Sequence, residues 1–294
     1  RPRRMSSAQR RVSFDPAPAT SEADPDGVVI RRAETQAEYD ECVRIQDEIW
    51  GADFNERVPA TIFRVSQYLG GVTAAAVAPA GSRVLGFVFG MTGVQDGRLV
   101  HWSDLLAVRP EARDRGIGRR LKLFQRSLVL PLGVTRMLWT FDPLVARNAH
   151  LNLNALGASV AEYVPDMYGV DTGSALHSAV GTDRFIVSWE LNSEPPARTH
   201  DHGIADPPPV RLIVNREDRM GQPPTVHPID EFPEVYIAIP GDIQQVITNA
   251  PDLARAWRDT TREAFLGYVQ RGYRVSGFHR AEGRGFYRLT RGDP

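Results

Sequence analysis

The chain has 294 residues, of which 42% are hydrophobic and 24% charged, and these fractions are ordinary for a globular protein with a sizeable core. Its 35 Lys and Arg residues nearly balance its 36 Asp and Glu residues, and this formal charge of −1 argues against a protein whose main task is to grip the phosphates of nucleic acid. No apolar run approaches the ~20 residues that cross a bilayer, which excludes a transmembrane helix.

Residues 1–27 are rich in Arg, Ser, Ala, Pro and Asp and have almost no large apolar side chains. Such a segment cannot bury enough surface to offset the entropy of ordering, so we expect a disordered N-terminal leader. Its arginines are not followed by an apolar region, which excludes a secretory signal. Because the chain begins with Arg, Met5 is a candidate for the true start.

The pattern becomes globular from Val28, and residues 28–192 are predicted to form one unit. Asp96-Gly97, between two apolar runs, is a strong signal for a tight hairpin turn. The elements predicted from apolar spacing are a strand at 28–30, helices at 36–49 and 61–68, strands at 72–78, 83–93 and 98–108, a helix at 116–130, a strand at 135–141, a helix at 146–156, and strands at 158–163 and 184–191.

Residues 193–209 are Pro-rich and polar, and we predict that they form a linker. His200 and His202 in this segment have no third ligand nearby, so we expect no metal there. Residues 210–294 are predicted to form a smaller α+β domain. Its expected elements are strands near 210–214 and 234–239, a helix at roughly 250–270, and strands near 273–279 and 285–290.

Two residue types occur only once. Cys42 is the only cysteine, which excludes intrachain disulfides and cysteine-cage zinc sites and makes a reducing cytoplasm the expected location. Lys122 is the only lysine, and arginine supplies every other basic side chain, a bias typical of a GC-rich genome. A mechanism that needs a lysine therefore has a single candidate.

One segment, VHWSDLLAVRPEARDRGIGRRLK, combines a strand, a charged loop and the start of a helix. The strand ends at Val108, and Gly116 and Gly118 stand at the helix start. Free N–H groups at a helix N-terminus carry partial positive charge, and glycines let an anion approach the backbone closely, so the segment predicts a polyphosphate site. A dinucleotide fingerprint and a Walker loop are excluded, because the third glycine and the Gly-Lys-Ser/Thr sequence are missing.

The spacing Arg-x-x-Gly-x-Gly in this context resembles the pyrophosphate loop of the GNAT superfamily, the acyl-CoA-dependent N-acyltransferases. The resemblance covers about residues 28–191. It implies an α/β fold with a mixed, mostly antiparallel central sheet that is splayed at the CoA site. The cofactor-binding residues that it implies by position are Leu106 and Val108, whose main chains would meet pantetheine, and Arg113, Arg115, Gly116, Gly118 and Arg119 around the pyrophosphate.

The same resemblance bears on the helix predicted at 146–156. In the family an asparagine at the start of this helix commonly touches the cofactor, which makes Asn148 a candidate. The family often has a tyrosine four residues before the glycine that ends the helix, here Gly157, where it protonates the departing thiolate. This chain has Leu153 instead, so another acid, a water or bulk solvent would serve, with Tyr163 and Tyr168 as candidates.

The segments FDPLVARNAHLNLNALGA, YVPDMYG and GTDRFIVSWEL also look like a smaller GNAT branch, some members of which are encoded beside N-succinyl amino acid racemases. This resemblance extends weakly into the second unit. It implies succinyl-CoA as an alternative to acetyl-CoA, and an amino acid as the acceptor.

The reaction needs a group that takes a proton from the attacking amine, and the strand before the loop offers His101, Ser103 and Asp104. Strict alternation places Asp104 on the face of Leu106 and Val108, with His101 and Ser103 on the other face. Asp104 is then better placed, whereas His101 has the better unperturbed pKa, so both are catalytic candidates. The alternative for each is a structural role.

Three further residues are candidates for substrate binding. Trp50, between the first two helices, lies where the GNAT fold usually receives its acceptor, with a core position as the alternative. Arg147 and Arg184 stand near strand ends and could pair with a carboxylate of the acceptor or of the acyl chain. Structural ion pairs are the alternative for both arginines.

Together these features predict an acyl-CoA-dependent N-acyltransferase that moves an acetyl or succinyl group from the CoA thioester to a primary amine by direct attack in a ternary complex. The expected acceptor is an amino acid or another small molecule, with no nucleic acid, membrane or metal involved, and a homodimer is left open. One alternative is a non-catalytic acyl-CoA-binding module, which Leu153 keeps open. The other is a protein-lysine acetyltransferase, which the near-neutral charge neither supports nor excludes.

Overall fold

The computed structural model describes residues 26–79, 83–169, 172–174, 180–194, 196, 206–219, 221–229 and 232–291. Residues 1–25 of the expected leader and most of the expected linker at 193–209, including His200 and His202, lie outside the described residues. No helix in the described ranges has the length and apolar character of a membrane span.

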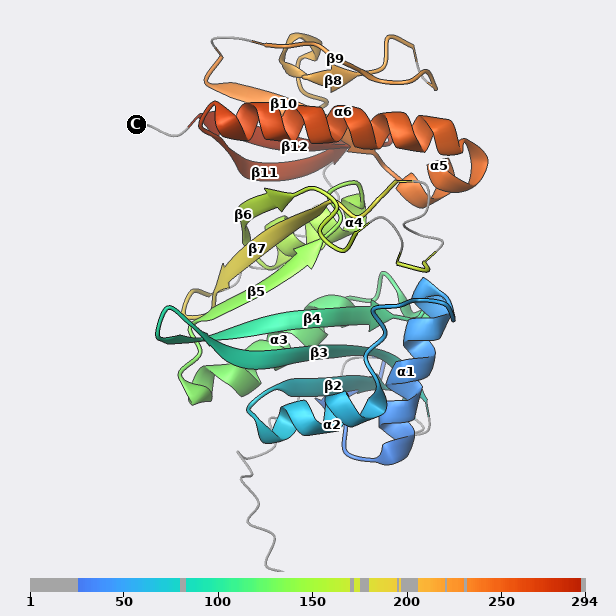
Figure 1. Ribbon diagram of the computed structural model, residues 1–294, viewed down its shortest axis with the longest axis vertical. Helices are drawn as coiled ribbons and strands as arrows, with labels where there is room; N and C mark the ends of the chain where they lie inside the picture. Colours follow the sequence, from blue (N-terminus) through green and yellow to red (C-terminus); the bar gives the residue numbers. More distant parts are fainter. Residues whose placement is uncertain are drawn as a thin grey trace, which may run out of the picture.

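The first part of the chain forms a seven-stranded sheet in the order β1-β2-β3-β4-β5-β7-β6 (Figure 1). Every neighbouring pair is antiparallel except β4 and β5, which run parallel. The strands are β1 (Val29–Arg32), β2 (Val72–Val77), β3 (Val84–Gln95), β4 (Arg98–Val108), β5 (Arg136–Phe141), β6 (Ser159–Val164) and β7 (Arg184–Glu190).

Helices cover both faces of this sheet (Figure 1). On one face lie α1 (Gln36–Trp50) and α2 (Ala60–Tyr68), and their apolar side chains share a core with alternate residues of β2, β3 and β4. On the other face lie α3 (Ile117–Val129), α4 (Ala146–Ala149) and a π-helical turn, η3 (His150–Ala155), which pack in the larger core. Short 3-10 turns at Pro110–Ala112 and Leu130–Leu132 flank α3.

Local sequence signals explain several element ends. The Thr35 hydroxyl accepts a bond from the Glu38 amide, and the Glu38 carboxylate accepts one from the Thr35 amide, a capping box that starts α1. Asp96 and Gly97 both have positive φ, 51° and 74°, as a two-residue hairpin turn between β3 and β4 requires. The predicted hairpin is therefore confirmed.

The C-terminal part is a three-stranded antiparallel sheet in the order β10-β12-β11, packed against a long helix. Its elements are a 3-10 turn (Val210–Leu212), β8 (Asn215–Arg216), β9 (Thr225–Val226), β10 (Glu234–Pro240), α5 (Ile243–Asn249), α6 (Pro251–Gln270), β11 (Tyr273–Ala281) and β12 (Arg284–Arg291). The strand predicted near 210–214 was wrong for its first residues, because the Leu212 amide bonds the Pro209 carbonyl at 2.8 Å and closes a turn. The fold class predicted from the sequence, a mixed and mostly antiparallel sheet with a smaller α+β part, is confirmed.

The two parts meet at the end of the first sheet and share one core. Phe185 of β7 packs against Phe265 of α6 and Tyr287 of β12, with ring centroids 4.8 and 5.5 Å apart. The Arg258 guanidinium of α6 donates to both carboxylate oxygens of Asp142, at 2.8 and 2.7 Å. The C-terminal part is thus packed onto the segment that follows β5, close to the site described next.

Candidate active site

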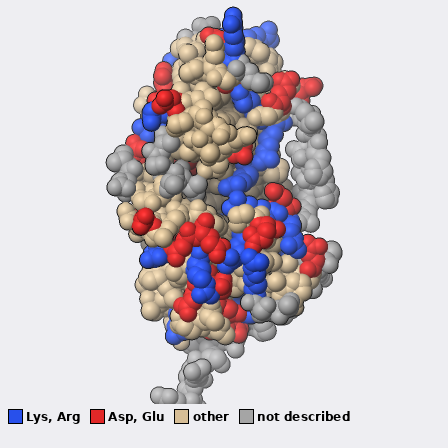
Figure 2. All heavy atoms as spheres, turned by 90° about the vertical axis from the view of Figure 1, so that its right-hand side faces the viewer, with Lys and Arg blue, Asp and Glu red and all other residues tan. Residues whose placement is uncertain are grey.

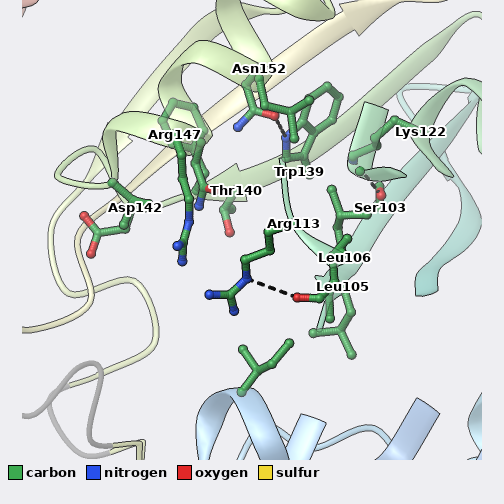
Figure 3. A pocket seen from close by; sticks show the side chains of 18 of the residues that line it. Ser103, Leu105, Leu106, Arg113, Lys122, Trp139, Thr140, Asp142, Arg147 and Asn152 are labelled. Atoms are coloured by element: carbon green, nitrogen blue, oxygen red, sulfur yellow. Dashed lines mark hydrogen bonds between the residues drawn. The ribbon is translucent and has the colours of Figure 1, made fainter. Parts of the chain in front are cut away.

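The site is a gap between the two parallel strands of the first sheet. β4 and β5 pair only from Val100–Trp102 to Arg136–Leu138, and beyond this point they separate around a cavity of about 780 Å³ (Figure 3). The Arg109 amide bonds the Leu85 carbonyl of β3 at 2.8 Å. Because backbone groups alternate along a strand, those of Leu106 and Val108 face the opened edge instead. The Val108 carbonyl accepts a bond from Arg113 Nε there, at 3.2 Å.

The N-terminus of α3 opens into the same cavity. Gly116 is its N-cap in the left-handed conformation, with φ 73°, and no side chain caps the helix. The first intrahelical bond is from the Arg120 amide to the Gly116 carbonyl, at 3.1 Å, so the three preceding amides have no partner within the helix. A Cβ at Gly118 would lie 3.8 Å from Leu106 and 3.7 Å from Leu151, so glycine keeps this part of the cavity open.

Two arginines point into the cavity from opposite walls, Arg113 from the loop before α3 and Arg147 from α4 (Figure 3). Neither forms an ion pair with any residue that the structure describes. Burial lowers the pKa of Arg113, and the charge of Arg147 lowers it further. Arg115 differs, because Asp26 pairs with it at 2.7 Å, and Arg119 donates to the Ala155 carbonyl at 3.1 Å. The cavity therefore holds positive charge that an anionic ligand would neutralise.

The positive charge is local, because the whole chain has a formal charge of −1. Figure 2 shows acidic and basic side chains interspersed over one face of the molecule, with a run of basic side chains down its middle. Such clustering concentrates an attractive field for anions without a net basic protein.

A β-bulge in β4 changes which side chains share a face. Leu105 pairs with Phe89 and Trp102 pairs with Met91, so two residues, Ser103 and Asp104, lie opposite Gly90 alone. The alternation predicted through this segment was therefore wrong. Glycine is required at the bulge, since a Cβ at residue 90 would lie 2.6 Å from the Trp102 carbonyl.

Around the bulge, the polar residues of β4 divide between the two faces of the sheet. His101 and Ser103 face α3, where both bond to Gln125. Asp104 instead lies on the side of α1 and α2 and accepts a bond from Trp102 Nε1 at 3.2 Å. Leu106 and Val108 pack with the core on the α3 side. The side chain of Asp104 is thus on the opposite face of the sheet from those of Leu106 and Val108.

Asp104 lines the cavity together with aromatic side chains. Trp50 stacks on Phe54 with ring centroids 5.5 Å apart, and both lie in the cavity wall with Glu56 and Tyr168. Partial enclosure raises the pKa of the Asp104 carboxyl, and the charge of Glu56 raises it further, against the bond from Trp102. This part of the cavity is acidic and aromatic, whereas the part near α3 is basic.

Two of the residues predicted as catalytic do not line the cavity. His101 has no exposed surface and sits between Thr92 and Gln125, and burial together with the charge of Lys122 lowers its pKa to about 3. Tyr163 is buried beside Phe265, and its hydroxyl donates to Asp183. Burial and that carboxylate raise the pKa of Tyr163. Both side chains belong to the packed interior.

Arg184 lies in the cavity wall but is engaged by protein groups. Its Nη1 donates to the Asp183 carbonyl at 2.9 Å and lies 3.9 Å from Asp142 Oδ2. Its guanidinium carbon also stands 5.3 Å from the centre of the Tyr168 ring. The Tyr168 hydroxyl is bonded to Thr140 at 2.9 Å. The structure therefore brings Arg184 to the site with partners already in place.

The remaining predicted residues line the cavity, and some residues in its wall were not predicted. Asn148, next to Arg147, was predicted and lines the cavity. Trp139 of β5 and Asn152 of η3 were not predicted; they are bonded to each other at 3.1 Å in the cavity wall. Gln244 and Arg280 come from the C-terminal part, and no sequence pattern links them to residues so far away along the chain. Lys122 also lies in this wall, although the sequence analysis gave it no place in the site.

The sequence matches no family model, and no curated protein sequence is significantly similar to it. Among solved structures, similar chains include yncA of Salmonella typhimurium with its cofactor acetyl-CoA, at 20% identity over 58% of this chain and 98% of that one, with a TM-score of 0.44. A GNAT superfamily phosphinothricin acetyltransferase of Sinorhizobium meliloti in complex with AcCoA matches at 18% identity over 59% and 96%, with a TM-score of 0.44. The ribosomal-protein-S18-alanine N-acetyltransferase of Escherichia coli matches at 17% identity over 59% and 99%, with a TM-score of 0.43.

Proposed function

We propose that this chain is an acyl-CoA-dependent N-acyltransferase of the GNAT superfamily. The observation that carries the proposal is the opened edge of β4 and the uncapped N-terminus of α3 facing one cavity. A linear ligand with amide groups at one end and a pyrophosphate at the other would satisfy both sets of backbone groups. Acyl-CoA has this arrangement, with pantetheine amides between the thioester and the phosphates.

The ligand's orientation follows from the charges of the cavity wall. The amides at the start of α3, next to Gly116 and Gly118, would hold the pyrophosphate. Arg113 and Arg147 would neutralise its negative charge, and Asn148 lies beside them. The pantetheine would then run along the main chain of β4 toward the point where the strands meet. This places the thioester deep in the gap and the nucleotide near the mouth.

The amine would approach from the opposite, acidic and aromatic part of the cavity. A carboxylate with a raised pKa is a better proton acceptor near neutral pH than an ordinary aspartate, and Asp104 has this property. Asp104 would take the proton that the ammonium must lose before its nitrogen attacks the thioester carbon. The oxyanion that then forms would be met by an N–H group on the opened edge of β4.

The residues of the same cavity wall indicate which acceptor and which acyl group the site would bind. Asp104 and Glu56 attract an ammonium group, and Trp50 and Phe54 offer apolar surface, so we propose a small primary amine as acceptor, an amino acid among the candidates. We propose acetyl-CoA as the donor, with succinyl-CoA as the alternative. A succinyl carboxylate would need a cation, and Arg184 already has protein partners in this wall.

The domain organisation is part of this proposal. Residues 28–192 would form the acyltransferase unit, 193–209 the linker and 210–294 the appended α+β domain. Gln244 and Arg280 lie in the cavity wall, so the appended domain would help to enclose the substrates. Asn154 of η3 donates to the Phe278 carbonyl of β11 at 2.9 Å, which ties the wall of the cavity to this domain.

The test is a pair of measurements on the full chain. Calorimetry with CoA and acetyl-CoA measures binding, and a thiol-release screen of amino acids, polyamines and lysine peptides against acetyl- and succinyl-CoA measures transfer. The proposal predicts both binding and thiol release with a small amine. Binding without release for any acceptor would favour the non-catalytic module, release only with peptides would favour a protein-lysine acetyltransferase, and no binding at all would reject the proposal.

A further inference from the structure

Lys122 is the one lysine of a chain with 35 Lys and Arg residues, and its side chain lies in the wall of the cavity with only 2% of the residue exposed. Arginine keeps its proton at any working pH, whereas a lysine amine can release one. Histidine aside, Lys122 is therefore the one basic side chain of the sequence that can exchange a proton, and it is enclosed at the proposed site. A fixed positive charge alone would not require lysine here, because arginine serves that purpose everywhere else.

The amine of Lys122 is held between the two strands where they begin to separate. Its Nζ donates to Ser103 Oγ of β4 at 2.7 Å and lies 3.7 Å from the centre of the Trp139 ring of β5 (Figure 3). Ser103 Oγ donates to Gln125 Oε1 at 2.7 Å, so the hydroxyl proton points away from Lys122 and its oxygen is left to accept. The contacts therefore fix both the position of the amine and the direction of its bond to Ser103.

The bonds continue behind Ser103 to a backbone carbonyl. Gln125 Nε2 lies 3.0 Å from His101 Nε2, and an amide nitrogen can only donate, so this imidazole nitrogen accepts. His101 Nδ1 then carries the proton and donates to Thr92 Oγ1 at 3.0 Å, and the Thr92 hydroxyl donates to the Gly70 carbonyl at 2.7 Å. Every group in this series behind Lys122 is neutral.

No carboxylate contacts the amine of Lys122 within the part of the chain that the structure describes. The groups that face it are the Ser103 hydroxyl from β4, the Trp139 ring from β5 and, behind Gln125, the neutral His101. Burial without a counter-ion lowers the pKa of Lys122 well below 10.5. Its ammonium therefore gives up a proton more readily than that of an exposed lysine.

Lys122 also lies on the face of the sheet where a bound thioester would place its sulfur. Ser103, Leu106 and the amides of α3 are on this face, whereas Asp104 is on the face from which the amine would approach. A thiolate forming on the α3 side would have the Lys122 amine in the cavity wall, which also holds the imidazole of His150 and the Tyr168 hydroxyl. The proton that leaves the amine and the proton that reaches the sulfur would then be transferred on opposite faces of the sheet.

We propose that Lys122 donates the proton to the CoA sulfur that leaves during acyl transfer, with Ser103 as its positioning residue; this inference rests on the proposed function. As the carbon–sulfur bond breaks, its electron pair goes to sulfur, an Nζ–H bond breaks and an S–H bond forms. The products at this end are the CoA thiol and a neutral amine at Lys122. The amine regains a proton from solvent before the next turnover.

The test compares Lys122→Met, which has a similar shape and no proton to give, with Lys122→Arg, which keeps the charge but holds its proton. Both variants should lose about 10²- to 10⁴-fold in kcat, the usual contribution of a general acid, while CoA still binds. Lys122→Met removes a buried charge that has no carboxylate partner, so we expect this variant to fold. Ser103→Ala should lose less, and Arg126→Met, one turn along α3 and outside the cavity, should leave kcat unchanged.

A second measurement does not depend on turnover. An ammonium beside the sulfur favours the thiolate, so the thiol of bound CoA, followed by its thiolate absorbance, should titrate at lower pH in the wild type than in Lys122→Met. Equal titration in the two proteins would overturn the inference even if Lys122→Met were unstable in the activity assay. Ser103→Ala should give an intermediate titration, because its lysine is present but less well held.

Three outcomes would reject the assignment. Near-wild-type kcat in Lys122→Met would show that no proton from this residue is needed, and near-wild-type kcat in Lys122→Arg would show that a fixed charge is enough. An acyl group found on Lys122 by mass spectrometry, formed as fast as product, would make it a nucleophile instead. These results differ from failure of the proposed function, in which the wild-type protein itself neither binds CoA nor releases thiol.

Discussion

Replacing Gly116 by aspartate tests whether the start of α3 binds an anion. The residue is the N-cap of α3 and has φ 73°, a conformation that asparagine and aspartate tolerate better than other non-glycine residues. An N-cap carboxylate bonds the second and third amides of the helix, which are the groups proposed to hold the pyrophosphate. Gly116→Asp should therefore block the site with both an acceptor and a charge. Gly116→Asn is the matched control, because it has the same size and no charge.

The magnitude follows from Coulomb's law. A carboxylate about 4 Å from one phosphate charge costs about 1 kcal/mol at the dielectric constant of water and about 4 kcal/mol at the lower value typical near a protein surface. We therefore expect CoA to bind Gly116→Asp at least tenfold more weakly than Gly116→Asn, a difference of ~1.4 kcal/mol. Calorimetry at two salt concentrations measures the difference in CoA affinity between the two variants, and added salt should make that difference smaller. Wild-type affinity in a folded Gly116→Asp protein would remove this loop from the site.

Three further predictions concern the acceptor face, the acyl group and the fold. Asp104→Asn should lower kcat by ~10²–10⁴ while CoA binding is retained. The loss of kcat, measured by thiol release, should become smaller as pH rises, because more of the amine is then already neutral. A loss below about tenfold at every pH would contradict a role for Asp104 as the base. Arg184→Met should lower turnover of acetyl- and succinyl-CoA alike, since its guanidinium serves Asp183 and Asp142, and a loss confined to succinyl-CoA would instead show that it binds the acyl carboxylate. Burial raises the pKa of Glu38, but the bonds from Arg31 and from two backbone amides outweigh it and lower the pKa to about 2. Glu38 therefore contributes stability that is present above its unfolded pKa of ~4.3 and is lost as pH falls toward 2. Urea unfolding should therefore show a smaller loss of stability across that interval for Glu38→Gln than for the wild type, and equal losses would contradict the assignment.

Signals within a few residues of each other were sufficient to predict much of the first part of the chain. The Asp96-Gly97 turn and the glycines before α3 require particular backbone conformations, and the structure has positive φ at Asp96, Gly97 and Gly116. Other local signals were present but not used. Asp242 caps α5 by accepting from the Gln244 and Gln245 amides, and the sequence pattern of an aspartate before a short apolar stretch could have indicated this helix.

Properties that depend on distant residues were not predictable in this way. Gln244 and Arg280 reach the cavity because the C-terminal part packs on the end of the first sheet, and their own neighbours in the sequence contain no sign of it. Leu153 lies on a π-helical turn rather than on a regular helix, so counting residues from Gly157 does not fix which side chain faces the cavity. Lys122 had a signal in its uniqueness, but its burial was needed to give that signal a meaning.

The bulge opposite Gly90 is the feature from which the two-sided chemistry of the site follows. With strict alternation, Asp104 would lie on the face of Leu106, on the same side as the proposed CoA site, where its carboxylate would compete with the phosphates for the cavity's arginines. The extra residue in β4 moves Asp104 to the other face and leaves Ser103 on the α3 side, where it holds Lys122. Because a side chain at residue 90 would collide with His101 and with the Trp102 carbonyl, a glycine in β3 determines how the polar residues of β4 are divided. One short segment of strand can thus place the proposed proton acceptor, Asp104, and the proposed proton donor, Lys122, on opposite faces of the sheet.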